Sequence, residues 1–182
     1  LARSAADGEL CDSLDGKVSL ILTNPPFGAE FSGRDLSRYK IAGVWPVHRP
    51  RKVDSELLFI ERYLEWLKPG GQFLAIVPDS ILTNRGLYAD LRKNIADLVD
   101  ICTVISLPDV TFAAAGTSTK TSILHVRKRP SKTARRSSTY FAICEDVGYS
   151  VATRGSQRKK IASGDGQLPR LLEDATAPEN AV

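Results

Sequence analysis

The 182-residue sequence has no methionine, only three cysteines and two histidines, and no apolar run long enough to cross a membrane. The odd number of cysteines and the absence of C-x-x-C spacing predict reduced, structural thiols and no metal site. With no transmembrane run and no secretory leader, the sequence predicts a cytoplasmic protein. Because the chain begins at Leu1 and contains no methionine, we also expect it to be a piece of a longer protein.

Composition is ordinary for a globular chain, but the charge is unevenly distributed. Apolar residues make up 42%, mean hydropathy is −0.16, and the length suits one domain. Ten Lys and Arg face only two acidic residues between Arg127 and Lys160, whereas the rest has fifteen basic and nineteen acidic residues. Clustered positive charge favours contact with nucleic-acid phosphates. A solvated linker rich in Lys, Arg and Ser explains the cluster equally well.

The most informative residues are Asn24-Pro25-Pro26-Phe27, which directly follow the apolar run Val18–Leu22. The prolines have no N–H and a restricted φ, so they make a stiff turn that presents carbonyl oxygens. Asn24 adds a side-chain acceptor and Phe27 adds a flat apolar face. Two acceptors and a ring suit the binding of a planar amino group. An ordinary turn at a strand end is the alternative interpretation.

Apolar runs and helical periodicity alternate through the first two thirds of the chain. We predict strands and helices in the order strand 17–23, helix 56–68, strand 72–77, helix 86–98 and strand 100–107. The first strand is almost entirely apolar, which is typical of a strand covered on both faces. This alternation predicts an α/β fold with a mostly parallel sheet and helices on both faces.

The alternation stops after residue 107. Thr117–Arg127 has strand character with no preceding helix, so we expect it to join the sheet antiparallel. Ser137–Cys144 is a candidate edge strand. Beyond Gly155, low hydrophobicity and many charges predict a linker or tail, apart from a short segment at Leu168–Leu172.

A long loop follows the tetrapeptide. Gly28–Val53 is rich in Gly, Pro, Arg and Ser. Such a long connection is uncommon in a compact domain unless it is functional or mobile. We therefore consider two interpretations, a lid that lines the substrate site and a disordered connector.

The tetrapeptide resembles the catalytic tetrapeptide of amino-group DNA methyltransferases, specifically the N6-adenine methylases of restriction–modification systems. The closest resemblance is to the modification subunit of type I systems and the related fused type II enzymes. The same tetrapeptide also occurs in methyltransferases for rRNA guanine N2 and for release-factor glutamine, which remain alternatives. Further family-like blocks follow in order, namely Glu56–Phe59, Lys68–Gly71, Ile76–Asp79, Leu107-Pro108 with Phe112, Thr121–Leu124 and Glu145–Tyr149. This ordered series favours the DNA methylases.

The resemblance implies a Rossmann-like methyltransferase sheet with a terminal antiparallel strand, and S-adenosylmethionine as the cofactor. It assigns Asn24, Pro25, Pro26 and Phe27 as the catalytic residues. In this scheme, Asn24 Oδ1 and the Pro25 carbonyl accept hydrogen bonds from the adenine amino group. Phe27 stacks on the flipped base.

Three further residues receive roles from the same resemblance. Phe112 and Asp79 are assigned to substrate binding, and Asn24 and Glu56 to cofactor binding. Core packing is nearly as good an explanation for Phe112. For Asp79, capping of the next turn is the alternative.

The family's glycine-rich loop for S-adenosylmethionine is missing from the sequence, and we expect it upstream of Leu1. Gly70-Gly71 precedes a predicted strand, so it does not match a loop between a strand and a helix. We therefore expect residues 1–127 to be the C-terminal part of the catalytic domain and 128–182 a basic edge strand with a linker or tail. The implied partners are double-stranded DNA and specificity and restriction subunits or fused domains. A non-catalytic DNA-binding or assembly module is the alternative from another functional class.

Overall fold

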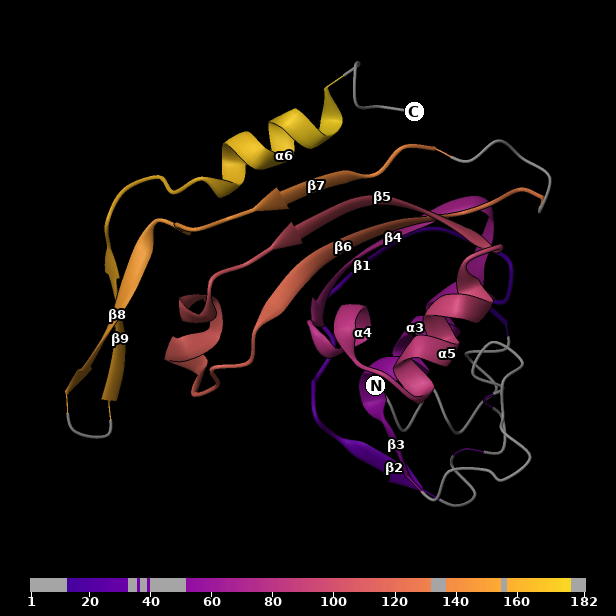
Figure 1. Cartoon of the computed structure of the whole chain (residues 1–182), viewed down its shortest axis with the longest axis horizontal. Helices are drawn as coiled ribbons and strands as arrows, with labels where there is room; N and C mark the ends of the chain where they lie inside the picture. The colour runs from indigo at the N-terminus through magenta and orange to yellow at the C-terminus, as the bar shows by residue number, and fades with distance from the viewer. Residues whose placement is uncertain are drawn as a thin grey trace.

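The computed structural model of the protein describes residues 13–32, 36, 39, 52–131, 137–154 and 157–177. Its strands are β1 (Val18–Thr23), β2 (Glu30–Ser32), β3 (Lys52–Asp54), β4 (Leu67–Pro78), β5 (Val99–Ser106), β6 (Thr121–Lys128), β7 (Tyr140–Ile143), β8 (Tyr149–Arg154) and β9 (Gln157–Ala162). The helices are α3 (Ser55–Trp66), α4 (Ser80–Thr83), α5 (Leu87–Ile95) and α6 (Leu168–Thr176), with the 3₁₀ helix η2 (Asp109–Ala115) between β5 and β6. Figure 1 shows their arrangement.

Five strands form the central sheet in the order β1-β4-β6-β5-β7. β1 pairs parallel with β4, and β5 pairs parallel with β7. β6 is antiparallel to both of its neighbours, β4 and β5. The predicted mostly parallel α/β sheet is confirmed, as is the antiparallel direction of the strand predicted at Thr117–Arg127. That strand lies inside the sheet and not at its edge, because it pairs with both β4 and β5.

Helices cover both faces of the sheet, as predicted. α3, α4 and α5 lie on one face, and α6 lies on the other (Figure 1). The larger core lies between the first three helices and the sheet, where Phe73, Ala75 and Val77 alternate along β4 and are at most 1% exposed. A smaller core lies beneath α6 and contains Ile105, Leu107, Ile123 and Cys144, with Leu168 and Leu171 packed against it.

β1 differs from its predicted environment. Leu20 and Leu22 are 56% and 68% exposed, so the expectation that both faces of this strand are covered is wrong. Among the described residues β1 pairs with β4 alone. Within the described ranges, the strand therefore presents an apolar face and one edge without a paired strand.

The end of the first helix also differs from the prediction. α3 stops at Trp66 instead of Lys68, and β4 begins at Leu67, five residues before the predicted strand. Lys128, from β6, donates hydrogen bonds from Nζ to the carbonyls of Leu64 (2.6 Å) and Leu67 (2.7 Å). Carbonyls at a helix C-terminus need partners, and here a cation from a distant strand supplies them. Sequence periodicity does not reveal such a partner.

The segment predicted as a linker or tail contains regular structure. β8 and β9 pair antiparallel as a separate two-stranded ribbon, and α6 follows. Ser137–Cys144 contains β7 at the sheet edge, as predicted. No helix in the described ranges is long and apolar enough to span a membrane.

The long loop after the tetrapeptide begins and ends in paired strands. β2 and β3 are antiparallel, with Glu30 opposite Asp54 and Ser32 opposite Lys52. Most of the remaining loop lies outside the described residues, so the lid and connector interpretations both stay predictions.

Candidate active site

The predicted site residues gather at one edge of the sheet. β1, β4, β5 and β7 run in the same direction, so their carboxyl ends meet there. The tetrapeptide follows β1, Asp79 follows β4, and η2 follows β5. Because β6 runs back in the opposite direction, η2 is a connection at this same edge. In α/β sheets, ligands bind outside the carboxyl ends of the strands.

Two aromatic rings from distant parts of the chain meet at this edge. The rings of Phe27 and Phe112 have centroids 6.4 Å apart and an interplanar angle of 87°, an edge-to-face contact. Both side chains are partly exposed, and neither belongs to a hydrophobic core cluster. This placement does not fit core packing of Phe112. The substrate-contacting roles of both rings stay predictions.

The start of α3 holds the loop that follows the tetrapeptide. The buried Ser55 donates from Oγ to the Pro26 carbonyl at 3.1 Å and from its main-chain N–H to the Ala29 carbonyl at 2.7 Å. The Gly28 N–H points to Glu56 Oε2 at 3.4 Å. Three contacts from two consecutive residues thus fix the tetrapeptide from its C-terminal side.

Glu56 takes part in a second set of contacts. The Tyr88 hydroxyl from α5 lies 2.6 Å from Asp54 Oδ2 and 3.0 Å from Glu56 Oε1. Burial and the neighbouring Asp54 carboxylate raise the pKa of Tyr88 well above its ordinary value, so the hydroxyl keeps its proton. Glu56 is 6% exposed and its carboxylate contacts protein groups. Its predicted contact with a cofactor stays untested.

Sequence reasoning missed Ser55 and Tyr88 as site residues. The available signal for Ser55 was weak, since a serine before a helical run is read as a cap. In the structure its hydroxyl bonds the tetrapeptide loop instead. Tyr88 lies more than thirty residues beyond Asp54, and no local pattern links the two.

Two acceptors of the tetrapeptide, on Asn24 and Pro25, have no hydrogen-bond partner among the described residues. Asn24 is exposed and Pro25 is buried. In the part of the chain that the structure describes, neither the Asn24 amide nor the Pro25 carbonyl makes a hydrogen bond. The two prolines also contribute no N–H groups that would compete for these oxygens. The turn therefore leaves both oxygens unpaired in the described structure, with the exposed Asn24 accessible to an external donor.

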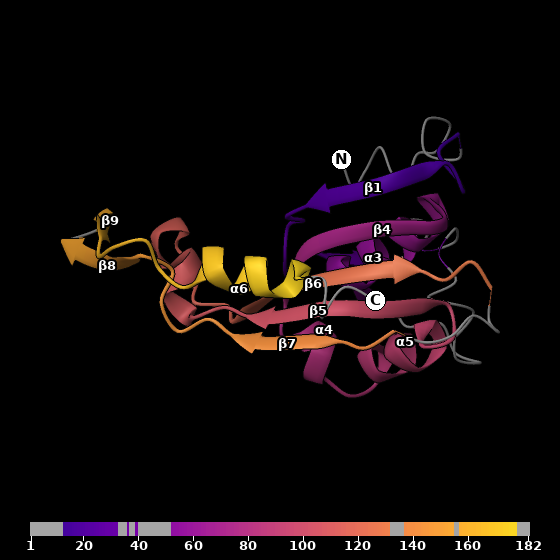
Figure 2. The ribbon, with the colours of Figure 1, turned by 90° about the horizontal axis from the view of Figure 1, so that it is seen from above.

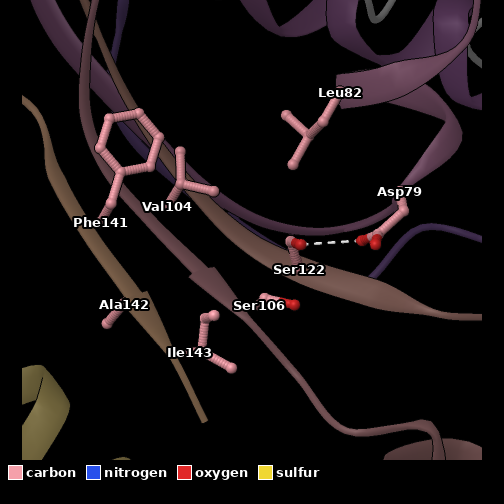
Figure 3. Close-up of a pocket in the computed structure, with 8 residues that line it drawn as sticks. All are labelled: Asp79, Leu82, Val104, Ser106, Ser122, Phe141, Ala142 and Ile143. Carbon is pink, nitrogen blue, oxygen red and sulfur yellow. Dashed lines mark hydrogen bonds between the residues drawn. The ribbon is translucent and has the colours of Figure 1, made fainter.

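Asp79 connects the edge of the site to β6. Its main-chain carbonyl accepts the N–H groups of Leu82 and Thr83, both at 2.9 Å, which begins α4. Its side chain accepts the Ser122 hydroxyl at 2.8 Å (Figure 3). Both groups line an open cavity of about 460 Å³ between α4 and β7, next to the exposed Phe141. Asp79 makes no side-chain cap bond, and its substrate role stays a prediction.

Sequence comparison identifies relatives of the chain. The model of a family described as N-6 DNA Methylase matches residues 6–164. The chain is 32% identical over 123 residues to the type I restriction enzyme StySPI methylase subunit of Salmonella potsdam, covering 68% of this chain and 20% of that protein. It is also 32% identical over 112 residues to the EcoKI methylase subunit of Escherichia coli K12, covering 62% and 19%. The chain thus spans about a fifth of the length of these curated relatives.

Solved structures support the fold. A type I restriction-modification system methyltransferase subunit from Streptococcus thermophilus superposes with a TM-score of 0.66 at 18% identity, over 95% of this chain and 34% of the other. A modification subunit of a type I restriction enzyme described as putative, from Vibrio vulnificus, gives 0.61 at 18% identity, over 89% and 32%. The family match runs from the residues before β1 through the tetrapeptide and η2 to the end of β9, and on this basis the chain belongs to the N-6 DNA methylase family.

Proposed function

We propose that the chain forms the methyl-acceptor side of an enzyme that methylates the N6 amino group of adenine in DNA. The observation that carries this proposal is the meeting of the unpartnered Asn24 and Pro25 oxygens with the Phe27–Phe112 pair at one sheet edge. Hydrogen-bond acceptors beside aromatic rings suit an aromatic base that carries an amino group.

The tetrapeptide oxygens act on the amino group. The adenine must first leave the duplex, because its N6 atom is otherwise out of reach. Its lone pair is delocalised into the ring, which makes it a weak nucleophile. Asn24 Oδ1 and the Pro25 carbonyl accept its two N–H bonds and stabilise positive charge that develops on nitrogen. By analogy with oxyanion donors, one such oriented group contributes about 3–4 kcal/mol.

The balance of the reaction is simple. The N6 lone pair would form a bond to the donor's methyl carbon while the bond from that carbon to the sulfonium sulfur breaks and leaves a neutral thioether, and one N6 proton would pass to water as the methylated base leaves the pocket. S-adenosylmethionine supplies the electrophilic methyl group when bound. Phe27 stacks on the base and Phe112 closes the pocket from the side, so that water is excluded from the reacting nitrogen. Base stacking of this kind contributes about 1–3 kcal/mol per ring.

The described residues fit only one side of the cofactor site. Asn24 is exposed at the end of β1, where it can reach both base and cofactor, whereas Glu56 is buried beneath the loop. We propose that Glu56 positions the tetrapeptide through Gly28. The unpaired edge of β1 and the exposed Leu20 and Leu22 fit a further layer of chain carrying the cofactor cradle.

The partners proposed here follow from the relatives. These are type I methylase subunits, and one similar solved structure concerns complex assembly of a type I system. We propose that the protein acts in the cytoplasm on double-stranded DNA, together with specificity and restriction subunits or equivalent fused domains.

Substitution of Asn24 tests the proposed function. In the full-length protein, Asn24→Ala removes one of the two acceptors, so we expect methyl transfer to DNA to fall by about 100-fold or more. Transfer is measured with tritiated S-adenosylmethionine, and cofactor binding by calorimetry should largely persist. Asn94→Ala on α5 is the matched control, because its amide bonds only the Asp90 carbonyl in the described structure.

Three outcomes would contradict the proposal. Near-normal DNA methylation by Asn24→Ala would remove the tetrapeptide from the reaction. Methyl incorporation by the wild type into rRNA or release factor, with none into DNA, would assign the same tetrapeptide to one of those substrates. A protein that binds DNA but not S-adenosylmethionine would be a non-catalytic module.

A further inference from the structure

The β8–β9 hairpin, residues Tyr149–Ala162, is here called the basic ribbon. It contains four basic residues, Arg154, Arg158, Lys159 and Lys160, and no acidic residue. The whole chain has 25 basic and 21 acidic residues, so the part outside the ribbon has 21 of each. The net charge of the basic ribbon, +4, therefore equals the net charge of the whole chain.

The basic ribbon projects from the body of the protein. Its two strands form a sheet of their own, separate from the central sheet. Figures 1 and 2 show it extending beyond η2, at the end of the molecule toward which β5 and β7 point. All four basic side chains are exposed. A charged two-stranded ribbon of this kind has the width that the major groove of B-DNA admits.

The ribbon is fixed where it leaves the body, which a solvated linker would not require. A Cβ on Gly148 would lie 2.6 Å from the Gly164 carbonyl oxygen, and a Cβ on Gly166 would lie 2.5 Å from the Gly148 nitrogen. Only glycine allows this close approach of two backbone segments. The Gln167 N–H also donates to the Asp146 carbonyl at 2.8 Å. The two ends of the ribbon are thus bound to each other.

The ribbon also contacts the helix that carries the second aromatic ring of the site. The Tyr149 hydroxyl donates to the Thr111 carbonyl at 2.7 Å, and the Arg158 guanidinium donates to the Ala113 carbonyl at 3.0 Å. These two carbonyls belong to the residues on either side of Phe112. The position of the ribbon is therefore linked directly to the Phe27–Phe112 pair.

Basic side chains occupy both faces of the ribbon. Residues opposite each other in an antiparallel pair share a face. Arg158 and Lys160 share the face of Tyr149, and Lys160 Nζ lies 4.1 Å from the centre of its ring. Lys159 and Arg154 lie on the other face. A strand of phosphates on either side of the ribbon would meet two cations.

We propose that the basic ribbon is a DNA-binding arm, which holds phosphates of the target duplex beside the base pocket. This inference rests on the proposed function and extends it to a second, non-catalytic contact with the same substrate. The phosphate backbone is the partner that the observations favour, because the ribbon combines exposed cations on both faces with a fixed position next to η2. An acidic protein surface is the competing partner and is an outcome of the test.

The test neutralises the face directed away from η2. The double variant Arg154→Gln/Lys159→Gln removes two exposed charges and leaves the contacts of Tyr149 and Arg158 intact. Each phosphate contact contributes about 0.9 to the magnitude of the negative slope of log K for DNA binding against log salt concentration. Loss of two contacts should therefore make the slope shallower by about 1.8. At 0.15 M salt this corresponds to about 30-fold weaker binding of DNA.

The control variant removes two charges elsewhere. Lys68→Gln/Lys93→Gln changes net charge equally, and both residues are exposed, at the opposite end of β4 and on α5. The Kd of a duplex is measured by fluorescence anisotropy over a series of salt concentrations, with the full-length protein and any subunits it requires. We expect the control to keep the wild-type slope. Thermal unfolding confirms that each variant is folded.

The outcomes separate this inference from the proposed function. A wild type that transfers no methyl group to DNA contradicts the proposed function. A wild type that methylates DNA, with a ribbon variant that keeps the wild-type Kd and salt slope, overturns the DNA-binding arm alone. Loss of a partner subunit in size-exclusion chromatography without a change in DNA binding would identify the ribbon as a protein-docking surface and would also overturn it.

Discussion

Removal of the Ser55 hydroxyl should impair methyl transfer more than it impairs stability. Ser55 is 1% exposed, and its Oγ lies 3.1 Å from the Pro26 carbonyl and 3.3 Å from Glu56 Oε2. Ser55→Ala keeps the main-chain bond to Ala29 and removes the two side-chain contacts, of which the one to the Pro26 carbonyl holds the tetrapeptide. A typical hydrogen bond contributes about 1 kcal/mol to the free energy of unfolding, so the loss in stability should be of this size.

The catalytic effect of the same substitution comes from the position of the tetrapeptide. If loosening of the Pro26 carbonyl costs about 1.4 kcal/mol of transition-state stabilisation, the methyl-transfer rate falls about tenfold. Single-turnover transfer of tritiated methyl groups measures this rate, and urea unfolding measures stability. Thr139→Ala is the matched control, because its hydroxyl also bonds a carbonyl, that of Ile101, at 2.7 Å.

One result would refute this reasoning. A Ser55→Ala protein that loses about 1 kcal/mol of stability but transfers methyl groups at the wild-type rate would show that the contact serves folding only. Thr139 directly precedes the edge strand β7, away from the tetrapeptide, so Thr139→Ala should lose stability without a change in rate.

Two further predictions concern the aromatic pair and pH. Phe112→Leu should weaken capture of the flipped base by about 1–3 kcal/mol, which a reduced 2-aminopurine fluorescence signal would report. The exposed Phe141→Leu is the control. An equal reduction of the signal in this control would contradict a specific role for Phe112. Burial lowers the pKa of His125 below its ordinary value, and the positive charge of Arg127 makes a smaller contribution in the same direction. The unfolded chain therefore binds the proton first as pH falls, so the free energy of unfolding should decrease below about pH 6.5, by at most about 1.4 kcal/mol per pH unit. Urea unfolding across pH should show this decrease in the wild type and not in His125→Gln; the same slope in both would exclude His125 as its source.

Whether a segment forms a strand or a helix was predictable where one side of the element is buried. β4 is the clearest case, because its buried residues alternate along the strand and Phe73 is fully buried. The meeting of Phe27 and Phe112 was not predictable from spacing, since they are 85 positions apart. It depends on the reversed direction of β6, which places η2 at the carboxyl edge. The resemblance to a known family supplied the expected pairing, and the geometry brings the two rings together.

The basic ribbon escaped prediction for a physical reason. Strands are recognised from alternation between buried and exposed positions, and β9 has none because all six of its residues are exposed. Its charge was visible, but its shape depends on backbone contact at Gly148 and Gly166. Similarly, nothing local to Ser55 indicates that its hydroxyl contacts the Pro26 carbonyl.

The central position of β6 also leads us to expect an order in which the site is assembled during folding. β5 and β6 close a short connection, whereas β4 pairs with β6 across more than forty intervening residues. Loop closure costs more entropy as the loop lengthens, so contacts of low sequence separation form more easily. The β5–β6 hairpin with η2 is thus a local unit, whereas the Phe27–Phe112 contact joins residues 85 positions apart. We expect the two rings to meet only once β6 has paired with β4 and β1 has paired with β4.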